Sequence, residues 1–481
     1  KTLLPCVPRD YPSGTVCVCN ASYCDSLDDV GPERPGEFIL VSSSKGGLRF
    51  LVATGKVTPN ENPPTVLLRE RRGKILVFHT KKFNIYGFGG AFTGAVSYNL
   101  DKLSKDLRHH IYRSYFSKKG GIGYSFIRLS IGGCDFDLKP WAYNEIPNKD
   151  ATLSNFTKLD ARDERKVEQL KDLMAVSDNF DIKYFGSAWS PPPWMKSNNA
   201  WTGLSVLKKE YYQTWADYHV KFIELMAAKN ISIWAISTGN EPLNGIIAWM
   251  FVRFMSLGWI AEDQMGWQKF GSNYQEIKFQ ECKTMERAEK GSTSYLDGLA
   301  VHWYWDDFIG SSTMDRTHNL YKDKLIINTE SCVGDKPWEK HGPELGSWSR
   351  AEKYFKSYLD DLRHWVNAWI DWNIVLDEQG GPNYVKNYVD SPIIVNTTSG
   401  EEIYKQPMFY AIGHFSKFIT EGSIRIWSSE PKGNISTVAF LRPDGNVVLI
   451  IFNGYLNIND KLSGNIMINI PARSFHTLVY K

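Results

Sequence analysis

The sequence predicts an α/β protein whose largest part is a (β/α)8 barrel, or TIM barrel. From about residue 82, β-rich segments alternate with amphipathic helical ones such as "KLSKDLRHHIYRSYF" at 102–116. Such alternation is typical of parallel strands joined by crossover helices. Short strand-like runs separated by Gly, Pro and Asn occupy about residues 29–80, and strands with Asn-Gly and Asp-Gly turns return from about residue 422. We therefore expect additional β-structure, rich in hairpins, toward both ends of the chain.

The strands of the predicted barrel share polar or aromatic carboxyl ends. Seven segments have a strand pattern: "FNIYGFGGAF" (83–92), "YSFIRLSIGG" (124–133), "IKYFGSAWS" (182–190), "ISIWAISTGN" (231–240), "LDGLAVHWYW" (296–305), "KLIINTES" (324–331) and "VNAWIDWNIVL" (366–376). In such barrels the carboxyl ends of the strands hold the active site. A doubly wound sheet would show the same alternation, but "YGFGGAFTG" after the first strand lacks the G-x-G-x-x-G spacing of a nucleotide-binding turn.

One strand of the eight is missing from this pattern. The segment from about 255 to 295 includes "FGSNYQEIKFQECKTMERAEKGS" (270–292), which does not alternate like a buried strand. We therefore expect either an irregular substitute that closes the barrel here or a shortened form of the barrel.

The cysteines are unevenly placed. Four of the seven, Cys6, Cys17, Cys19 and Cys24, lie close to the start of the chain, and the others are the isolated Cys134, Cys282 and Cys332. The cluster indicates two disulfides that staple a small lobe. A zinc site is the alternative, but Cys17-Val-Cys19 lacks the usual two-residue gap. Five Asn-x-Ser/Thr sequons, at Asn20, Asn155, Asn230, Asn396 and Asn434, also favour the secretory pathway.

Charge and hydropathy indicate which kinds of binding partner are not expected. The net charge is +3, from 56 basic and 53 acidic residues without a long run of one sign, so a nucleic-acid partner is not indicated. No apolar run approaches the roughly 20 residues that span a bilayer, and we expect no transmembrane segment. His302 lacks a second clustered ligand in the sequence, so we expect no metal and no other cofactor.

Two glutamates stand where barrel strands end. Glu241 follows the apolar run around Trp234 and Ile236 and precedes Pro242, which cannot extend a strand ladder. Glu330 follows "LIIN" in the same way. Two carboxyl groups that face each other across a cleft suit glycoside hydrolysis, in which one protonates the leaving oxygen and the other attacks the anomeric carbon or activates water there. Burial and mutual repulsion would keep one of them protonated.

Long motifs surround these glutamates and extend along the chain. They are "CVCNASYCDS", "GNEP" at Glu241, "GLAVHWYW", "NTESCVG" at Glu330, "GGPNYVKNYVDSPIIV" and "YKQPMFYAIGHFSKFITEGS". Together they resemble the animal lysosomal glucosylceramidases (acid β-glucosidases) of glycoside hydrolase family 30, nearly from end to end. The resemblance implies a (β/α)8 barrel beside a β-sandwich built from both chain ends, with a small disulfide-bonded β lobe. We accordingly expect the lobe in 1–28 with 374–404, the sandwich in 29–80 with 422–481, and the catalytic barrel in 81–373 with 405–421.

The resemblance also implies roles for individual residues. Glu241 is similar to the acid/base and Glu330 to the nucleophile of a retaining mechanism. Asn240 resembles the asparagine that donates to the sugar 2-hydroxyl. The other expected residues are Asp135 for distal sugar hydroxyls, Trp189 and Trp372 as aromatic walls, Asn387 at the polar rim, and Arg128 as the cation that holds the nucleophile ionised. His302 and Tyr304 alternate on one predicted strand, so both can face the pocket. The pairing Cys6–Cys17 and Cys19–Cys24 is implied in the same way.

The implied activity is hydrolysis of the β-glucosidic bond of glucosylceramide. It brings with it a glycosphingolipid substrate at a membrane surface, a saposin-like activator protein as a candidate partner, and a place in the lysosomal lumen or outside the cell. The chain departs from the family pattern at Gly94 and Gly239, where acidic residues are usual, and in the shorter interval between Glu241 and Trp303. Two alternatives follow: a non-catalytic glycolipid-binding relative, and a retaining glycosidase of different sugar specificity. Retention of two carboxylates that repel each other argues against a pure binder.

Overall fold

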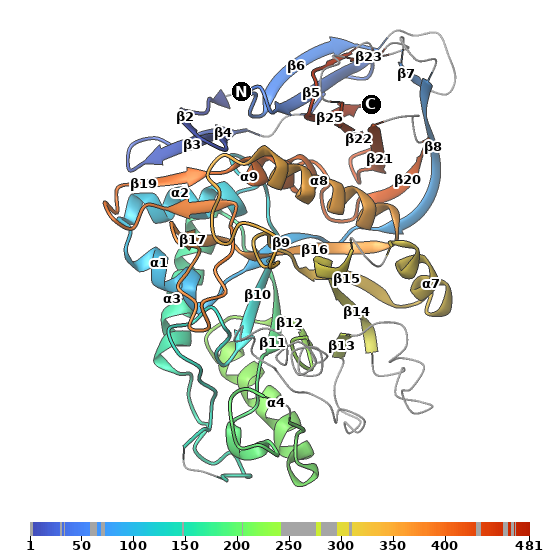
Figure 1. Ribbon diagram of the computed structural model, residues 1–481. Coiled ribbons are helices and arrows are strands. Elements are labelled where there is room, and N and C mark those ends of the chain that lie inside the picture. Colours follow the sequence, from blue (N-terminus) through green and yellow to red (C-terminus); the bar gives the residue numbers. More distant parts are fainter. Residues whose placement is uncertain are drawn as a thin grey trace.

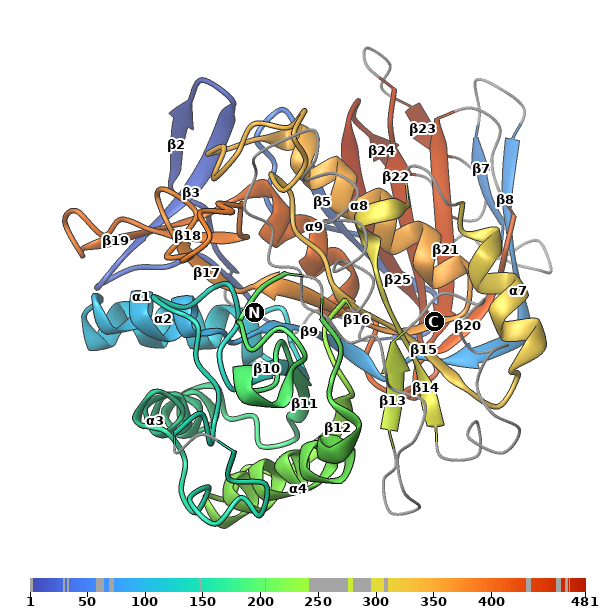
Figure 2. The same ribbon diagram turned by 60° about the horizontal axis from the view of Figure 1, so that its bottom comes forward.

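The computed structural model of the chain describes residues 3–28, 31–32, 34–57, 65–68, 73–146, 149–203, 205–241, 276–279, 296–306, 310–429, 434–455, 460–462, 466 and 468–481. Pro242, Cys282 and most of the segment 255–295 lie outside these ranges. Within them, the chain forms a closed barrel, a ten-stranded sheet and a five-stranded sheet (Figures 1 and 2). In this part of the chain no helix is both long and apolar enough to cross a bilayer.

The barrel consists of parallel strands that follow one another in sequence order. They are β9 (Gly87–Ala91), β10 (Phe126–Ile131), β11 (Lys183–Ala188), β12 (Ile233–Ser237), β13 (Glu276–Phe279), β14 (Leu296–His302), β15 (Leu325–Glu330) and β16 (Val366–Asn373). Each of the seven predicted segments contains one of these strands. Phe126 and Phe185 pack in one apolar cluster with side chains of β14, β15 and β16. Because side chains alternate along a strand, Arg128 and Ser187 lie on the same faces as these phenylalanines, two residues nearer the carboxyl ends.

The fifth strand lies inside the segment that the sequence pattern left without one. β13 pairs with β14 over four residue pairs with a register shift, but with β12 only through Ser237 and Ile277. A short strand therefore closes the barrel where the sequence pattern showed none, and its pairing is irregular on the β12 side, as the first of the two predicted alternatives has it. Four residues are too few for an alternating pattern to stand out from polar neighbours.

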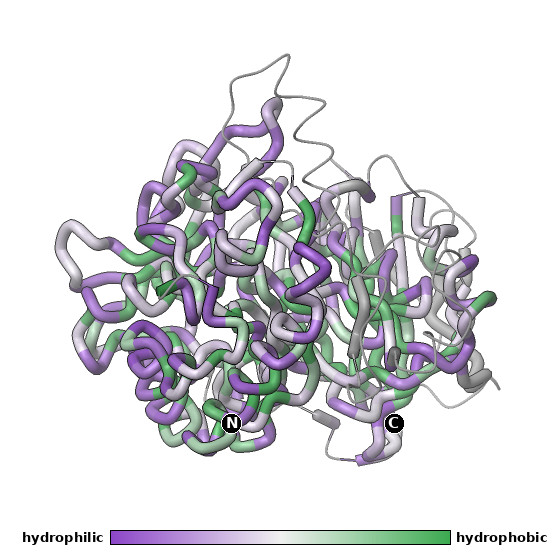
Figure 3. Tube along the Cα trace, turned by 90° about the horizontal axis from the view of Figure 1, so that it is seen from below, coloured by the Kyte–Doolittle hydropathy of each residue, from purple (hydrophilic) through white to green (hydrophobic). Residues whose placement is uncertain are grey.

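Helices cover the outside of the barrel. They are α1 (Gly94–Asp101), α2 (Lys105–Phe116), α3 (Ala161–Ser177), α4 (Tyr212–Ala228), α7 (Ser312–Leu320), α8 (Trp348–Arg363) and α9 (Pro407–Ser416). Side-chain oxygens cap several of them, as Ser104 does for α2 by accepting from the Leu107 N–H. Hydrophobic stretches of the trace gather toward the inside, as Figure 3 shows. α8 and α9 lie between the barrel and the ten-stranded sheet (Figure 1).

The ten-stranded sheet joins residues from both ends of the chain. Its order is β24 (Ile468–Ile470), β23 (Asp460–Leu462), β7 (Thr65–Leu68), β8 (Gly73–Asn84), β20 (Ile424–Ser428), β21 (Ile435–Leu441), β22 (Val447–Asn453), β25 (Ser474–Tyr480), β5 (Glu37–Ser44) and β6 (Leu51–Lys56). β22 is buried on both faces: Leu449 and Ile451 belong to the core within this sheet, whereas Val448 and Ile450 belong to the core shared with the barrel. The sheet and the barrel therefore share one continuous interior.

The five-stranded sheet forms a lobe beside the barrel, in the order β17 (Val375–Asp377), β18 (Ile393–Val395), β19 (Glu402–Lys405), β3 (Gly14–Asn20) and β2 (Pro8–Tyr11). β1 (Leu3–Leu4) and β4 (Ser26–Leu27) pair beside it. Disulfides join Cys6 to Cys17 and Cys19 to Cys24, which is the implied pairing and excludes the zinc alternative for these thiols.

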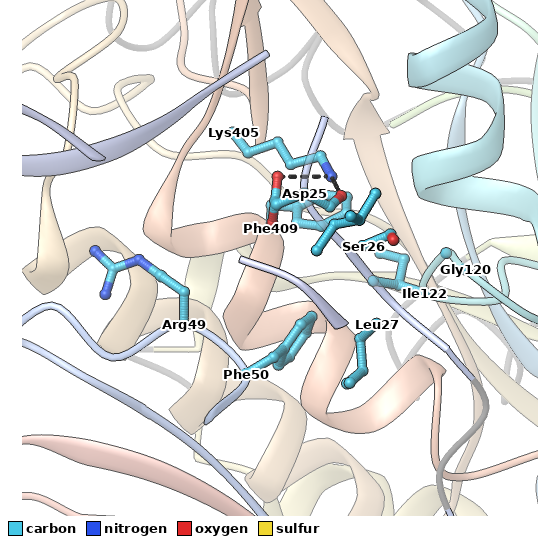
Figure 4. A pocket seen from close by; sticks show the side chains of 11 residues that line it. Asp25, Ser26, Leu27, Arg49, Phe50, Gly120, Ile122, Lys405 and Phe409 are labelled. Atoms are coloured by element: carbon cyan, nitrogen blue, oxygen red, sulfur yellow. Dashed lines mark hydrogen bonds and ion pairs between the residues drawn. The ribbon is translucent and has the colours of Figure 1, made fainter. Parts of the chain in front are cut away.

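A buried ion pair inside this lobe is linked to helix α9 of the barrel through Tyr410. The Lys405 ammonium lies 3.1 Å from the Asp25 carboxylate and also donates to the Asp25 carbonyl, at 2.7 Å. Figure 4 shows this pair at the edge of a small pocket, with Arg49 and Phe50 on the other side. The Tyr410 hydroxyl donates to the second Asp25 oxygen, at 2.6 Å, so both carboxylate oxygens have partners. A buried charge is tolerated when it is paired and hydrogen-bonded in this way.

Candidate active site

The predicted site residues gather at the carboxyl ends of the barrel strands. Glu330 is the last residue of β15 and lies beside His302, the last residue of β14. Asn240 and Glu241 follow β12, and the Asn240 N–H donates to the Ala188 carbonyl at the end of β11, at 2.9 Å. Strand ends from non-neighbouring parts of the sequence therefore surround one space, as expected for the active face of a (β/α)8 barrel.

Glu330 is held by two donors. The Arg128 guanidinium, which comes from β10, donates to Oε2, and the Tyr304 hydroxyl donates to Oε1 at 2.8 Å. The Glu330 residue is 6% exposed, so these donors act in a setting with little water. Hydrogen bonds to a charged acceptor are the stronger kind, and both bonds stabilise the ionised carboxylate.

Glu241 is more exposed and has a different partner. Its side chain is 24% exposed, and its Oε1 lies 2.7 Å from Nδ1 of His302. Burial lowers the pKa of His302 to about 3, so the imidazole is neutral. A neutral imidazole can accept from a protonated Glu241 or donate to an ionised one. Glu241 also has φ +46°, a left-handed backbone that is uncommon for residues other than glycine.

The two glutamates face each other closely. One carboxylate oxygen of Glu241, one of Glu330 and a ring nitrogen of His302 all lie within 4.8 Å of one another. Such a triad has the residue types of a metal site, but both Glu330 oxygens already accept bonds from Arg128 and Tyr304. A cation there would also face the Arg128 charge. In the other group of this kind among the described residues, Cys19, Cys24 and Asp25, the two sulfurs form a disulfide.

Arg128 connects the nucleophile candidate to the walls of the site. Its Nη2 donates to Oδ1 of Asn240 at 2.7 Å. The guanidinium carbon lies 4.8 Å from the ring centre of Trp189 and 5.2 Å from that of Trp372. The two indoles are stacked, with centroids 5.4 Å apart. The cation is therefore covered by aromatic faces, which strengthens its contact with Glu330.

Asp135 lies in the loop after β10. Burial, and next the charge of Glu330, raise the pKa of Asp135 to about 7, so this carboxyl group is close to half protonated near neutral pH. The Asn383 amide donates to Oδ2 of Asp135 at 3.0 Å. The sequence analysis did not single out Asn383, and it expected Asn387 at the polar rim. The backbone N–H of Asn387 donates to Asn383 Oδ1, at 3.2 Å, so Asn387 supports the residue that contacts Asp135.

Tyr304 reaches the site from another element than expected. β14 ends at His302, and Tyr304 lies in the 3-10 turn Trp303–Trp305. The expectation that both residues alternate on one strand was therefore wrong, although both side chains border the same space, with ring centroids 6.0 Å apart. The Tyr304 oxygen also lies 3.2 Å from the sulfur of Cys332. Cys332 and Cys134 are buried free thiols, and burial raises the pKa of both.

Gly94 is one of the two departures from the family pattern. A side chain at Gly94 would collide with the carboxylate of Asp137. Asp137 in turn accepts from the Cys134 N–H at 2.9 Å, within the turn that carries Asp135. The space beside α1 thus still contains an acidic group, which comes from Asp137 and not from residue 94.

A (β/α)8 barrel with two facing glutamates at its strand ends defines the chain as a glycoside hydrolase. The family model described as "Glycosyl hydrolase family 30 TIM-barrel domain" matches residues 85–271 and 281–419. The model described as "Glycosyl hydrolase family 30 beta sandwich domain" matches residues 422–478. The chain belongs to glycoside hydrolase family 30.

Curated relatives agree with this assignment. The chain is 35% identical to "Lysosomal acid glucosylceramidase" of Mus musculus, with 99% of this chain and 96% of that protein covered. It is 34% identical to "Putative glucosylceramidase 3" of Caenorhabditis elegans over 99% and 95%. The fold is also that of SrfJ from Salmonella typhimurium, with a TM-score of 0.75 and 22% identity over 92% of this chain and 99% of that one.

Proposed function

We propose that the protein is a retaining β-glucosidase that hydrolyses the β-glucosidic bond of glucosylceramide to glucose and ceramide. The observation that carries the mechanism is the facing pair Glu241 and Glu330, with carboxylate oxygens within 4.8 Å. Retaining glycosidases have carboxyl groups about 5 to 5.5 Å apart, whereas inverting enzymes need roughly 6.5 to 9.5 Å to admit a water molecule. The short separation supports retention.

In the first step, an oxygen of Glu330 attacks the anomeric carbon. The bond from that carbon to the leaving oxygen breaks, and Glu241 gives its proton to this oxygen. In the second step, a water molecule gives a proton to Glu241 and attacks the same carbon, and Glu330 leaves as a carboxylate. Arg128 and Tyr304 support these roles because they stabilise the charge that Glu330 carries before and after the covalent intermediate.

Other residues are assigned to substrate binding. Oδ1 of Asn240 accepts from Arg128, so we assign its amide Nδ2 to the sugar 2-hydroxyl, a bond that strengthens in the transition state. Asp135, oriented by Asn383, can accept from distal sugar hydroxyls or donate to them because its pKa is about 7. The stacked Trp189 and Trp372 offer aromatic walls to the ring.

The substrate class rests on the relatives. The name of the mouse relative describes action on glucosylceramide in lysosomes. We extend to this chain a glycosphingolipid substrate presented at a membrane surface, a saposin-like activator protein, and a location in the lysosomal lumen or outside the cell. One similarity supports the alternative of a different sugar specificity. The chain is 24% identical to "Endo-1,6-beta-D-glucanase BGN16.3" of Trichoderma harzianum over 83% of this chain.

A covalent label tests the mechanism. An activated 2-fluoroglucoside or a cyclitol epoxide should modify Glu330, because a retaining enzyme forms a covalent glycosyl intermediate. Peptide mass spectrometry locates the label, and Glu330→Gln serves as the unlabelled control. A label on any other residue contradicts the assignment of Glu330.

A substrate panel tests the specificity. Glucosylceramide in detergent micelles should be turned over faster than an aryl β-xyloside and a β-1,6-glucan. Faster cleavage of the glucan or the xyloside would replace the proposed specificity with another. Glycolipid binding without turnover of any β-glucoside would support the non-catalytic alternative.

A further inference from the structure

The turn that follows β10 carries two groups of the candidate active site. Asp135 supplies the carboxyl group assigned to distal sugar hydroxyls. The ring of Phe136 lies edge-on to Trp372, with the two centroids 5.7 Å apart. A shift of this turn would therefore move the sugar-binding carboxyl group and disturb one aromatic wall at the same time.

Asp137 holds this turn together from within. It is buried, and its Oδ2 accepts from the Cys134 N–H at 2.9 Å, so the carboxyl group joins the residues on either side of Asp135. The Phe136 carbonyl accepts from the Ala95 N–H in the first turn of α1, at 2.7 Å. While both bonds persist, the backbone on each side of Asp135 has little freedom to move.

Gly94, the first residue of α1, leaves the space that the Asp137 carboxyl group occupies. A Cβ at position 94 would lie 1.8 Å from Oδ1 of Asp137, and the three heavy atoms nearest to it all belong to the Asp137 side chain. The backbone of Gly94 is helical and does not itself require glycine. The first turn of α1 contains no acidic residue of its own, and a helix favours a negative group at this end. The missing side chain of Gly94 is thus matched to the place of the Asp137 carboxyl group.

A buried lysine contributes positive charge beside this turn. Lys166 of α3 lies 3.0 Å from Oδ1 of Asp163 and donates to Ser130 Oγ of β10, at 3.3 Å. Burial raises the pKa of Asp137, and the Lys166 charge opposes that rise. With little water nearby, the bond between Asp137 and the turn is stronger than it would be at the surface.

We propose that Asp137 is a positioning residue, which fixes the turn in which Asp135 meets the distal hydroxyls of the glucose unit. The inference rests on the proposed function, in which Asp135 binds those hydroxyls. Asp137 acts through Asp135 and not on the reacting atoms, because its carboxyl group is enclosed between the turn and α1. Gly94 is needed because any side chain there displaces this carboxyl group. Loss of the Asp137 contact should therefore lower selectivity for distal hydroxyls.

Deoxy substrates test this role. The measurement is kcat/KM for an aryl β-glucoside and for its 4-deoxy and 6-deoxy analogues, per active molecule titrated with the Glu330 label. The ratio of the glucoside value to a deoxy value reports how well the missing hydroxyl is recognised. Asp137→Ala should lower at least one of these ratios about tenfold, the size of one hydrogen bond lost. Asp137→Asn keeps an oxygen acceptor in the same place and should keep the wild-type ratios.

Gly94→Ala disturbs the same contact from the side of α1. Its methyl group displaces the Asp137 carboxyl group, so the same ratio should fall by a similar factor, about tenfold. In Asp137→Ala the space is free, and adding Gly94→Ala should cause no further loss, because both changes act on one contact. The control is Leu138→Ala, since Leu138 is the next residue of the turn and is 64% exposed. This control should keep the wild-type ratios.

A variant of Asp135 separates the possible failures. Asp135→Ala should itself lower the ratios, and adding Asp137→Ala should then change them no further. Wild-type ratios in both Asp137→Ala and Gly94→Ala, even with a lower Tm, would make Asp137 a residue of stability alone and overturn the positioning role. An additional fall in the Asp135→Ala background would also overturn it. Unchanged ratios in Asp135→Ala would overturn the binding role of Asp135, and a protein that cleaves no β-glucoside would overturn the proposed function, in each case with the positioning role.

Discussion

Buried polar side chains are treated in opposite ways in two regions of the molecule. At the barrel mouth, the space around Glu241 and Glu330, charged and titratable groups lie against one another. Around β25 of the ten-stranded sheet, the buried His414 and His476 bind only neutral hydroxyl groups. His414 of α9 lies on the barrel side of the sheet, and His476, opposite Ile451, lies on the other face. We call this second region the histidine interface.

The hydrogen bonds of the histidine interface fix the state of each ring. Thr477 donates to the His414 carbonyl, so Nδ1–H of His414 donates to Thr477 and its Nε2 accepts from Ser43. Ser474 donates to the Pro471 carbonyl, so Nε2–H of His476 donates to Ser474 and Nδ1 accepts from Ser42. Both imidazoles are neutral, and each has one donor and one acceptor in use.

The difference shows that buried polar groups can contribute to stability in one region and to catalysis in another. At the histidine interface each histidine has its hydrogen-bond partners and no net charge, which stabilises the packing on both faces of β25. At the barrel mouth the raised pKa of Asp135 records charges crowded together with little water, a cost that folding bears because the chemistry requires it. Removing a hydroxyl should therefore lower activity at the barrel mouth and lower stability at the histidine interface.

The largest effect is expected at the barrel mouth, from Glu241→Gln. Without the acid, turnover of substrates with poor leaving groups should fall by about 100- to 10,000-fold, whereas glycosylation by an activated aryl glucoside should persist because its leaving group needs little protonation. Azide should then restore the second step, and the glycosyl azide is identified by mass spectrometry. Full activity of Glu241→Gln on glucosylceramide would place the acid elsewhere.

Two hydroxyl deletions sharpen the comparison itself. Tyr304→Phe removes one donor to the Glu330 carboxylate and should lower kcat about 10- to 100-fold with little change in Tm, since a bond to a charged group is worth about 1.5 to 3 kcal/mol. Thr477→Val leaves His414 without its acceptor and should lower the free energy of unfolding by about 1 to 3 kcal/mol. Activity per folded molecule of Thr477→Val should equal that of the wild type. The comparison fails if Thr477→Val loses catalysis or Tyr304→Phe mainly loses stability.

Acidification should change the free energy of unfolding through two buried groups, His476 and Asp361, with opposite signs. Burial lowers the pKa of His476 to about 3, so between about pH 6.5 and 3 only the unfolded chain binds this proton, and the free energy of unfolding falls as pH drops. Burial raises the pKa of Asp361, in α8, to about 7, so between about pH 7 and 4 the folded chain binds a proton that the unfolded chain does not, and acid stabilises. Each group contributes up to about 1.4 kcal/mol per pH unit.

Two variants, one for each group, test the predicted pH dependence of stability. Urea unfolding at pH 7 and pH 5 gives the change in stability on acidification. His476→Gln should make that change more favourable to the folded state than in the wild type, and Asp361→Asn should make it less favourable. Identical changes in the wild type and both variants would mean that neither group alters its proton affinity on folding.

The smallest effect concerns β13, where the barrel closes with one residue pair to β12. Amides of Glu276–Phe279 should exchange at least about tenfold faster than those of β15, because fewer ladder bonds oppose local opening. Hydrogen exchange with mass spectrometry measures both strands in one sample. Equal protection of β13 and β15 would show that the short strand is as firmly closed as the rest.

The sequence predicted those parts of the site that have a local signature. Glu241 and Glu330 were found because a carboxylate that ends an apolar strand is visible in a few neighbouring residues. The contact of Asn383 with Asp135 joins residues 248 positions apart, and no local pattern reports it. The pairing of His302 with Glu241 is similarly hidden, because it depends on how the ends of β12 and β14, on either side of β13, come together.

The fold followed the same rule. Seven barrel strands were predicted because each has several alternating residues, and β13 was not because four residues give too little pattern. Tyr304 was placed on a strand because "HWY" continues the alternation of β14, but the chain turns immediately after His302. Competition between a turn and one more strand residue is decided by packing, which the sequence pattern does not contain.

The lobe imposes an order on the assembly of the chain during its synthesis. β3 pairs with β19, so Cys17 lies opposite Lys405 and Cys19 opposite Ile403. The ribosome releases the first of these strands long before the second, and pairing over such a separation is slow. The two disulfides, by contrast, span only 11 and 5 residues and can close as soon as the first segment emerges. The disulfide-bonded hairpin can therefore form first, and β19 can pair with it only after the barrel residues have been synthesised.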